Sequence, residues 1–291
     1  MPFNRTVPVG YPDSQPHPKP RNRRRLRDSE GPADLPNESA PHPLREGRPP
    51  GHGTSDRTGH YRVGAVCGVL GPALLIVGTL MHPVPEHLND PATAFAAYAP
   101  VSRATWVTAH LLQLAGASGM VLELVMLSWA ASPLGSSRLF AQLTTVFGAS
   151  AIAVTATLQA VDGVALKATV DLWSQAVSSE RPALLAAATA VRQIEIGLDG
   201  MFSLTLAATT LTFGLVLIHG TRWTRLLGVL AAVTAVTAAV GGVLFCLQGF
   251  SPAAMNTSTT SGALGIALTL AAAVWGWRRA AKSARPGDPR R

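Results

Sequence analysis

The chain has 291 residues, of which 47% are hydrophobic and only 14% are charged, and its formal net charge is +8. A soluble domain carries about 25% charged residues, so this composition excludes an ordinary soluble protein and favours a membrane protein. The positive charge does not indicate nucleic acid binding, because the arginine clusters flank apolar stretches, as orientation signals do. We therefore expect the lipid bilayer as a partner and no nucleic acid.

Residues 1–60 have the composition of an unfolded tail. They hold 12 of the 22 prolines and the basic run Arg21–Arg27, and they contain almost no large apolar residues. Such a segment cannot bury enough surface to offset its chain entropy. We predict a disordered, Pro/Arg-rich cytoplasmic tail, with anionic lipid headgroups as the expected contact of the arginine run.

Six apolar stretches are each long enough to cross, as a helix, a hydrocarbon core of about 30 Å. They cover residues 61–81, 104–131, 139–161, 199–218, 223–250 and 259–277. We predict an all-α fold, a polytopic membrane protein whose six-transmembrane-helix bundle spans residues 61–277 and is followed by a basic cytoplasmic tail at 278–291. In the first span, Gly64, Gly68 and Gly78 are small residues of the kind that let another helix approach closely.

The segments between the spans differ in charge. Basic residues gather in both tails and in the loops at Arg138 and Arg222, whereas segments 82–103 and 162–198 are neutral to acidic. By the positive-inside rule the basic side is cytoplasmic, which places both termini inside and the protein in the inner (plasma) membrane. Segments 82–103 and 162–198 then form a small helical extracytoplasmic cap.

Local signals predict helices within this cap. Asp90 followed by Pro91 is typical of a capping residue before the first helical position, and predicts a helix at 91–98. Lys167 and Asp171 lie four residues apart, where they can pair on one helix face. Pro182 marks the start of a helix that continues into the fourth span.

Polar side chains that lipid would exclude gather where four spans meet this outer face. They lie after the first span, one to two turns into the second, at the end of the third, and on one helix face that leads into the fourth. These residues are His82, His110, Gln113, Asp162, Arg192, Glu195 and Asp199. We expect an outward-facing polar pocket that binds a small polar ligand, ion or lipid headgroup, in a binding protein rather than an enzyme. No catalytic residue or cofactor is identified.

The histidines leave two other interpretations open. Histidine with carboxylate is common in metal sites and in acid–base chemistry, so His82 and His110 are candidate ligands for a metal or haem in a redox protein or enzyme. No H-E-x-x-H motif or histidine pair at helical spacing adds to this hypothesis. In a purely structural role, His110 and Gln113 would bond to each other or to loop carbonyls.

Glu123 is a separate intramembrane acid. It lies 13 residues beyond His110, about 20 Å deeper in the membrane and on another helix face. It is the candidate proton carrier if the protein is a proton-coupled transporter. The alternatives are a protonated acid that bonds to Thr144 or Thr145, or a position at the cytoplasmic interface near Arg138.

Four motifs together resemble one group of proteins. They are Met81-His82-Pro83, WVTAHLLQ at 106–113, LQAVDGVALK at 158–167 and VRQIE at 191–195. The chain is similar, over about residues 60–280, to a family of six-span integral membrane proteins of GC-rich, actinobacterial-type bacteria. That family has no known activity, so the resemblance implies the topology but no function, and the oligomeric state stays open.

Overall fold

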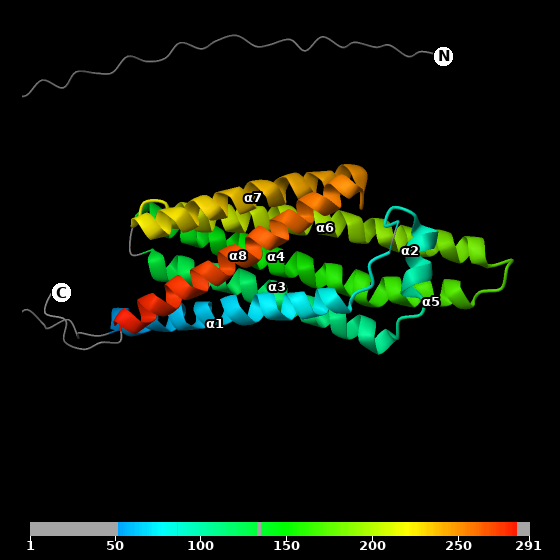
Figure 1. Ribbon diagram of the computed structural model, residues 1–291, viewed down its shortest axis with the longest axis horizontal. Coiled ribbons are helices and arrows are strands. Elements are labelled where there is room, and N and C mark those ends of the chain that lie inside the picture. The colour runs from blue at the N-terminus through cyan, green and yellow to red at the C-terminus, as the bar shows by residue number, and fades with distance from the viewer. Residues whose placement is uncertain (1–51, 86, 133–134, 284–291) are drawn as a thin grey trace, which may run out of the picture. The chain divides into compact units, whose positions relative to one another are not determined.

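The computed structural model describes residues 52–85, 87–132 and 135–283. In these residues the chain forms eight α-helices and one π-helical turn, and no strand (Figure 1). Six of the helical segments in this part are long and apolar enough to cross a membrane, which confirms the predicted all-α, six-helix bundle. Residues 1–51 and 284–291 make up most of the two predicted tails and lie outside the described residues.

The long helices run back and forth between two ends of the bundle. They are α1 (His52–Met81), α3 (Arg103–Ala131), α4 (Ser136–Ala160), α6 (Arg181–Leu217), α7 (Arg222–Gln248) and α8 (Pro252–Ser283). The short helices α2 (Pro91–Tyr98) and α5 (Lys167–Gln175) lie at one end, called here the cap end (Figure 1). At the other end, the basic end, α1 begins and α8 finishes.

Some predicted boundaries are correct and others are too short. α2 covers the predicted residues, and the Asp90 side chain accepts a hydrogen bond from the Ala92 N–H, as expected of a cap. α6 begins at Arg181, next to the predicted start. However, α1 and α8 extend into both segments predicted as tails, because adding residues to a formed helix costs far less than nucleating one.

The third span also continues past its predicted end at residue 161. A π-helical turn, η1 (Val161–Leu166), joins α4 to α5, so that residues 136–175 form one almost continuous helical segment. Polar residues ended the predicted span at this point, but here they line a pocket or pair with each other. Lys167 and Asp171 form the predicted ion pair, with 2.7 Å between Nζ and Oδ1.

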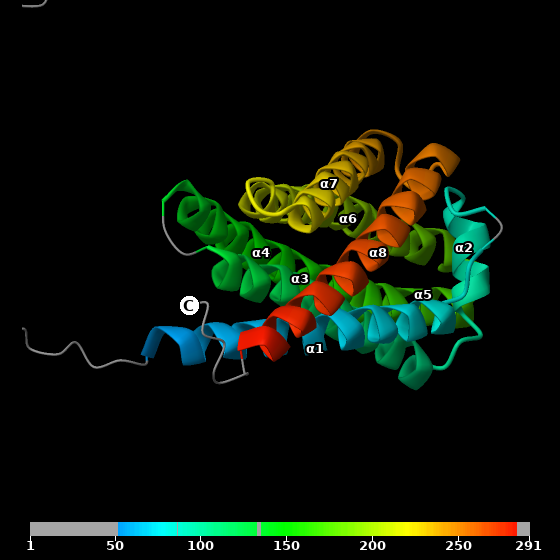
Figure 2. The same cartoon turned by 60° about the vertical axis from the view of Figure 1, so that its left-hand side comes forward.

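α1 packs along α3 through a line of glycines, called here the glycine seam (Gly71, Gly78, Gly116 and Gly119). A Cβ atom on Gly71 would lie 2.9 Å from the Gly116 carbonyl oxygen, and one on Gly78 would lie 2.6 Å from the Ala109 carbonyl oxygen. The predicted close approach of another helix to the first span is therefore confirmed. α8 crosses the bundle and packs against α1 at one end and α7 at the other (Figure 2).

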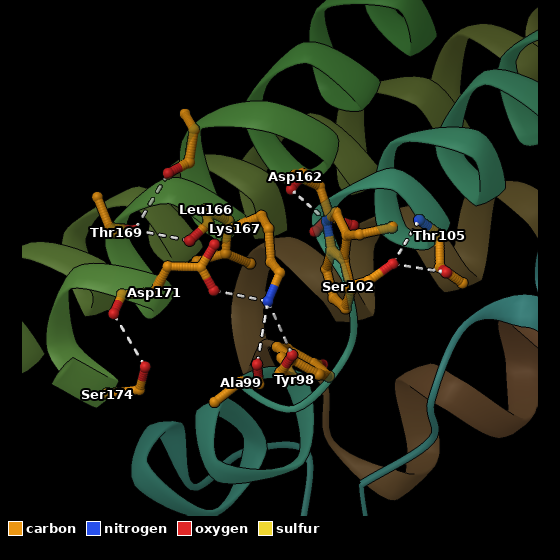
Figure 3. Close-up of polar contacts among 12 residues, drawn as sticks. Tyr98, Ala99, Ser102, Thr105, Asp162, Leu166, Lys167, Thr169, Asp171 and Ser174 are labelled. Carbon is orange, nitrogen blue, oxygen red and sulfur yellow. Dashed lines mark hydrogen bonds and ion pairs between the residues drawn. The ribbon is translucent and has the colours of Figure 1, made fainter.

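An aromatic cluster holds α2 on the bundle. Phe95, Tyr98, Trp106 and Trp173 are buried together there. Beside this cluster, the Lys167 ammonium group donates to the backbone carbonyls of Tyr98 (3.2 Å) and Ala99 and to the Asp171 carboxylate (Figure 3). These bonds connect the end of α2 to α5, and thereby fix one wall of the pocket described next.

Candidate functional site

A polar pocket of about 260 Å³ lies at the cap end, between the end of α1, α3, η1 and α6. Six of the seven predicted residues line it, from all four predicted spans. These are His82, Gln113, Asp162, Arg192, Glu195 and Asp199. The seventh, His110, is only 2% exposed and contacts the pocket through Asp162, with 2.9 Å between Nε2 and Oδ2.

The π-helical turn η1 positions Asp162 for this contact. The Trp106 indole N–H donates to the Asp162 backbone carbonyl at 3.0 Å, which ties η1 to α3. Gly163 allows the close approach, because a Cβ atom there would lie 2.9 Å from the Cβ atom of His110. Single π-helical turns inside α-helices are frequent at functional sites.

Backbone carbonyls determine which ring nitrogen of each histidine carries the proton. His110 Nδ1 lies 2.7 Å from the Trp106 carbonyl oxygen, and His82 Nδ1 lies 2.9 Å from the Pro83 carbonyl oxygen. A carbonyl only accepts, so each Nδ1 must donate, and in a neutral ring Nε2 then keeps its lone pair. For His110 this lone pair lies against the Asp162 carboxylate, a repulsive arrangement unless a proton or a metal ion lies between them.

The two histidines and Asp162 have the composition and spacing of a metal site. One ligand atom from each lies within 4.8 Å of the other two. Nitrogen and oxygen ligands about 2.0–2.2 Å from one ion are about 3–3.5 Å apart, so modest side-chain shifts would bring all three to the same ion. Metal-binding histidines usually donate their second N–H to a carbonyl or carboxylate, as both rings do here.

The same geometry does not favour haem. Two axial histidines must lie on opposite faces of the porphyrin. The rings of His82 and His110 instead contact each other edge to face, with centroids 5.3 Å apart, and Trp106 stacks on His110. The residues therefore fit a single ion better than a macrocycle.

Arg192 supports the opposite wall and is only 2% exposed. Its guanidinium group donates to the Leu88 carbonyl (2.9 Å) and to the Tyr98 hydroxyl (3.3 Å), and lies over the Phe250 ring. In the part of the chain that the structure describes, no carboxylate lies within ion-pair distance of it. Arg192 thus ties the segment after α1 to α6 and leaves the pocket carboxylates available.

The unpaired buried atoms of the pocket accept hydrogen bonds. Glu195 Oε2, Asp162 Oδ1 and Gln159 Oε1 have no hydrogen-bond partner among the described residues. Burying such acceptors without donors is costly. The pocket therefore favours a cation, or a ligand that carries donors.

Burial shifts the pKa values of two groups that line the pocket from their ordinary values. It lowers the pKa of His82 below 6.5, which keeps the ring neutral, as a metal ligand must be. It raises the pKa of the Tyr98 hydroxyl to about 12, so that Tyr98 stays protonated beside Arg192.

Glu123 lies apart from the pocket. Its side chain is 0% exposed, its carboxyl group packs against Gly68 of α1, and neither carboxyl oxygen has a hydrogen-bond partner among the described residues. The predicted bond to Thr144 or Thr145 is wrong, because both threonine hydroxyls donate to backbone carbonyls of their own helix.

The supporting roles of Trp106 and Tyr98 could not be read from the sequence. An aromatic residue near the end of a span usually indicates the membrane interface. One signal was present, since Trp106 precedes His110 by four residues and must share its helix face. In the described residues the His110 ring contacts the Trp106 carbonyl of its own helix and Asp162 of η1, rather than Gln113 or a loop carbonyl.

No family model, curated protein or solved structure matches the chain. The family suggested by the sequence motifs therefore stays a prediction. The fold and the site together define the class as a six-helix, multi-pass membrane protein that carries a His-His-Asp group in a polar pocket at one end of its bundle.

Proposed function

We propose that this protein binds a divalent transition-metal ion through His82, His110 and Asp162. The observation that carries the proposal is the geometry of His110, whose Nδ1 lies 2.7 Å from the Trp106 carbonyl oxygen while its Nε2 lies 2.9 Å from Asp162 Oδ2. A bound metal ion would take His110 and Asp162 as two of its ligands. His82, with Nδ1 engaged by a carbonyl, supplies the third ligand.

The bound ion would keep open coordination positions. Two imidazoles and one carboxylate suit zinc, iron(II) and similar ions, and three protein ligands leave room for water or a ligand. Glu195 and Gln159 line the same pocket and can accept hydrogen bonds from whatever fills those positions. The metal is therefore proposed as part of a ligand-binding site rather than as a closed structural site.

We also propose that the pocket faces the outside of the plasma membrane. Arg57, Arg138, Arg222 and Arg279 lie near helix termini at the basic end, whereas the pocket lies at the cap end. The positive-inside rule supports a cytoplasmic location for the basic end and for both termini. Proton-coupled transport through Glu123 is not proposed, since Glu123 lines neither this pocket nor the second, apolar cavity of the bundle.

Metal content tests the proposal. Detergent-purified full-length protein is incubated with Zn²⁺, Mn²⁺ or Fe²⁺ in turn, desalted, and measured by elemental analysis beside His82→Ala, His110→Ala and the isosteric Asp162→Asn. The control is His87→Ala, because His87 is exposed and does not line the pocket.

We expect near-stoichiometric metal in the wild type and in His87→Ala. The three ligand variants should lose about tenfold or more in affinity, the range seen even when second-shell partners of ligands are removed. A wild type that holds none of the three ions contradicts the proposal, and a proton then bridges His110 and Asp162. Retention of metal by all three ligand variants also contradicts it.

A further inference from the structure

A second cavity, of about 190 Å³, lies between α3, α6, α7 and α8, and adjoins the polar pocket at Asp199, which lines both. Most of its lining is apolar, including Met120, Phe202 and Leu206. We call it the apolar cavity. It exists because α8 packs on α1 and α7 and contacts α3 and α6 much less (Figure 2).

The glycines of α8 leave this space open. A Cβ atom on Gly262 would meet nothing within 4 Å, and one on Gly265 would make only ordinary contacts, with the side chains of Met120 at 3.8 Å and Thr234 at 4.0 Å. Both glycines line the cavity. They therefore do not serve close helix packing, and their absence of side chains contributes volume instead.

The cavity is long enough for part of a hydrocarbon chain. Its α6 lining extends from Asp199 to Thr210, a separation of eleven residues or about 16 Å. This is about half of a hydrocarbon core of ~30 Å. Apolar cavities of about 150 Å³ stay dry and take up small hydrocarbons, so an apolar occupant suits this cavity better than water.

Two of the six hydroxyl groups in the lining are engaged within their own helices. Thr234 and Thr269 donate to backbone carbonyls of their own helices. The strongly polar group is Asp199, at the border with the polar pocket. A ligand that fits both cavities must therefore be polar at one end and apolar at the other.

We propose that the ligand of this site is a single-chain amphiphile whose head carries a hydroxyl or ammonium donor and lies in the polar pocket, while its hydrocarbon chain lies in the apolar cavity. The donor matches the unpaired acceptors on Asp162 and Glu195. The position of the head rests on the proposed metal-binding pocket, whereas the position of the chain rests on the apolar cavity alone.

Photo-crosslinking tests this ligand class on the full chain in detergent. The probes are a long-chain alkyl amine, the matching alcohol and its methyl ether, each with a diazirine in mid-chain. Mass spectrometry measures the labelled fraction and the labelled peptides. The variant Gly262→Leu is designed to fill the cavity. If Gly262→Leu does not give monodisperse protein, Gly265→Leu is used in its place. Gly197→Leu on α6 is the matched control, because a Cβ atom there also meets nothing within 4 Å and Gly197 lines neither cavity.

We expect the amine, the alcohol or both to label residues 199–210 and 258–269, and the ether to label them weakly. Gly262→Leu should reduce labelling about tenfold, because excluding two methylene groups already costs that factor, and Gly197→Leu should label like the wild type. Equal labelling of Gly262→Leu and the wild type overturns the inference, as does equal labelling by the ether.

Metal content measured on the same samples separates the two proposals. A metal-free wild type whose labelling still depends on Gly262 contradicts metal binding and supports the chain site. If the wild type holds stoichiometric metal but Gly262→Leu is labelled as strongly as the wild type, the result supports metal binding and overturns the amphiphile proposal.

Discussion

Glycine residues have opposite structural roles in two regions of this bundle: in one they allow close backbone contact, and in the other they leave a space unfilled. In the glycine seam, a Cβ atom on Gly116 would fall on the backbone of Leu75 and lie 2.7 Å from the Gly71 carbonyl oxygen. Beneath α8, a Cβ atom on Gly262 would meet nothing. Small residues in membrane helices thus mark either close backbone contact or retained volume, and the residue type alone does not distinguish them.

The buried acidic residues of the two regions also differ, because one is packed between helices and the others line a pocket. Glu123 packs against Gly68 beside the seam and lines neither cavity. Asp162 and Asp199 line the polar pocket, and Asp162 contacts a histidine. The region around α1 and α3 therefore holds the bundle together, and the space between α3, α6 and α8 is where the proposed ligand would lie.

The largest expected difference comes from adding one methyl group in each region. Gly116→Ala should lower the free energy of unfolding by about 1–3 kcal/mol, because the α1 and α3 backbones must separate. Gly262→Ala should leave stability unchanged or raise it by up to about 1 kcal/mol, because alanine favours the helix and meets no neighbour. Thermal unfolding in detergent measures both. A similar loss in the two variants would show that both glycines serve close packing.

A smaller effect of opposite sign is expected at Glu123. Glu123→Met removes a buried carboxyl group without a partner and should raise stability by about 1–2 kcal/mol. Glu123→Gln keeps a buried polar group and should change stability by less than about 0.5 kcal/mol. The same unfolding measurement checks both variants. A lower melting temperature for Glu123→Met would mean that the carboxyl group has a stabilising partner.

The last effect is absent at neutral pH, because it concerns the titration of Tyr98 at the wall of the polar pocket. Burial raises the pKa of Tyr98 from 10.0 to about 12. The unfolded chain therefore loses this proton first, so the stability linked to Tyr98 is complete below about pH 10 and is lost as pH rises toward 12. The melting temperature should fall more steeply over this window in the wild type than in Tyr98→Phe. Parallel slopes would contradict a raised pKa.

Much of the architecture is determined by the sequence alone. Six apolar runs of membrane-spanning length require six helices, because buried backbone groups in lipid must bond within the segment. Asp90 with Pro91 begins α2, and the spacing of Lys167 and Asp171 produces their ion pair. Span order also brought the polar residues to one end, since successive spans alternate direction and these residues all lie at span ends on the same side.

Only the tertiary structure decided what these residues do to one another. The π-helical turn brings Asp162 to His110, the carbonyls of Trp106 and Pro83 select the histidine tautomers, and the oblique path of α8 leaves the apolar cavity open. Each of these depends on the register between helices far apart in sequence. Local propensity and periodicity specify a helix and its faces, but they carry no information on that register. The His-His-Asp group and the apolar cavity therefore appear only when the helices are packed.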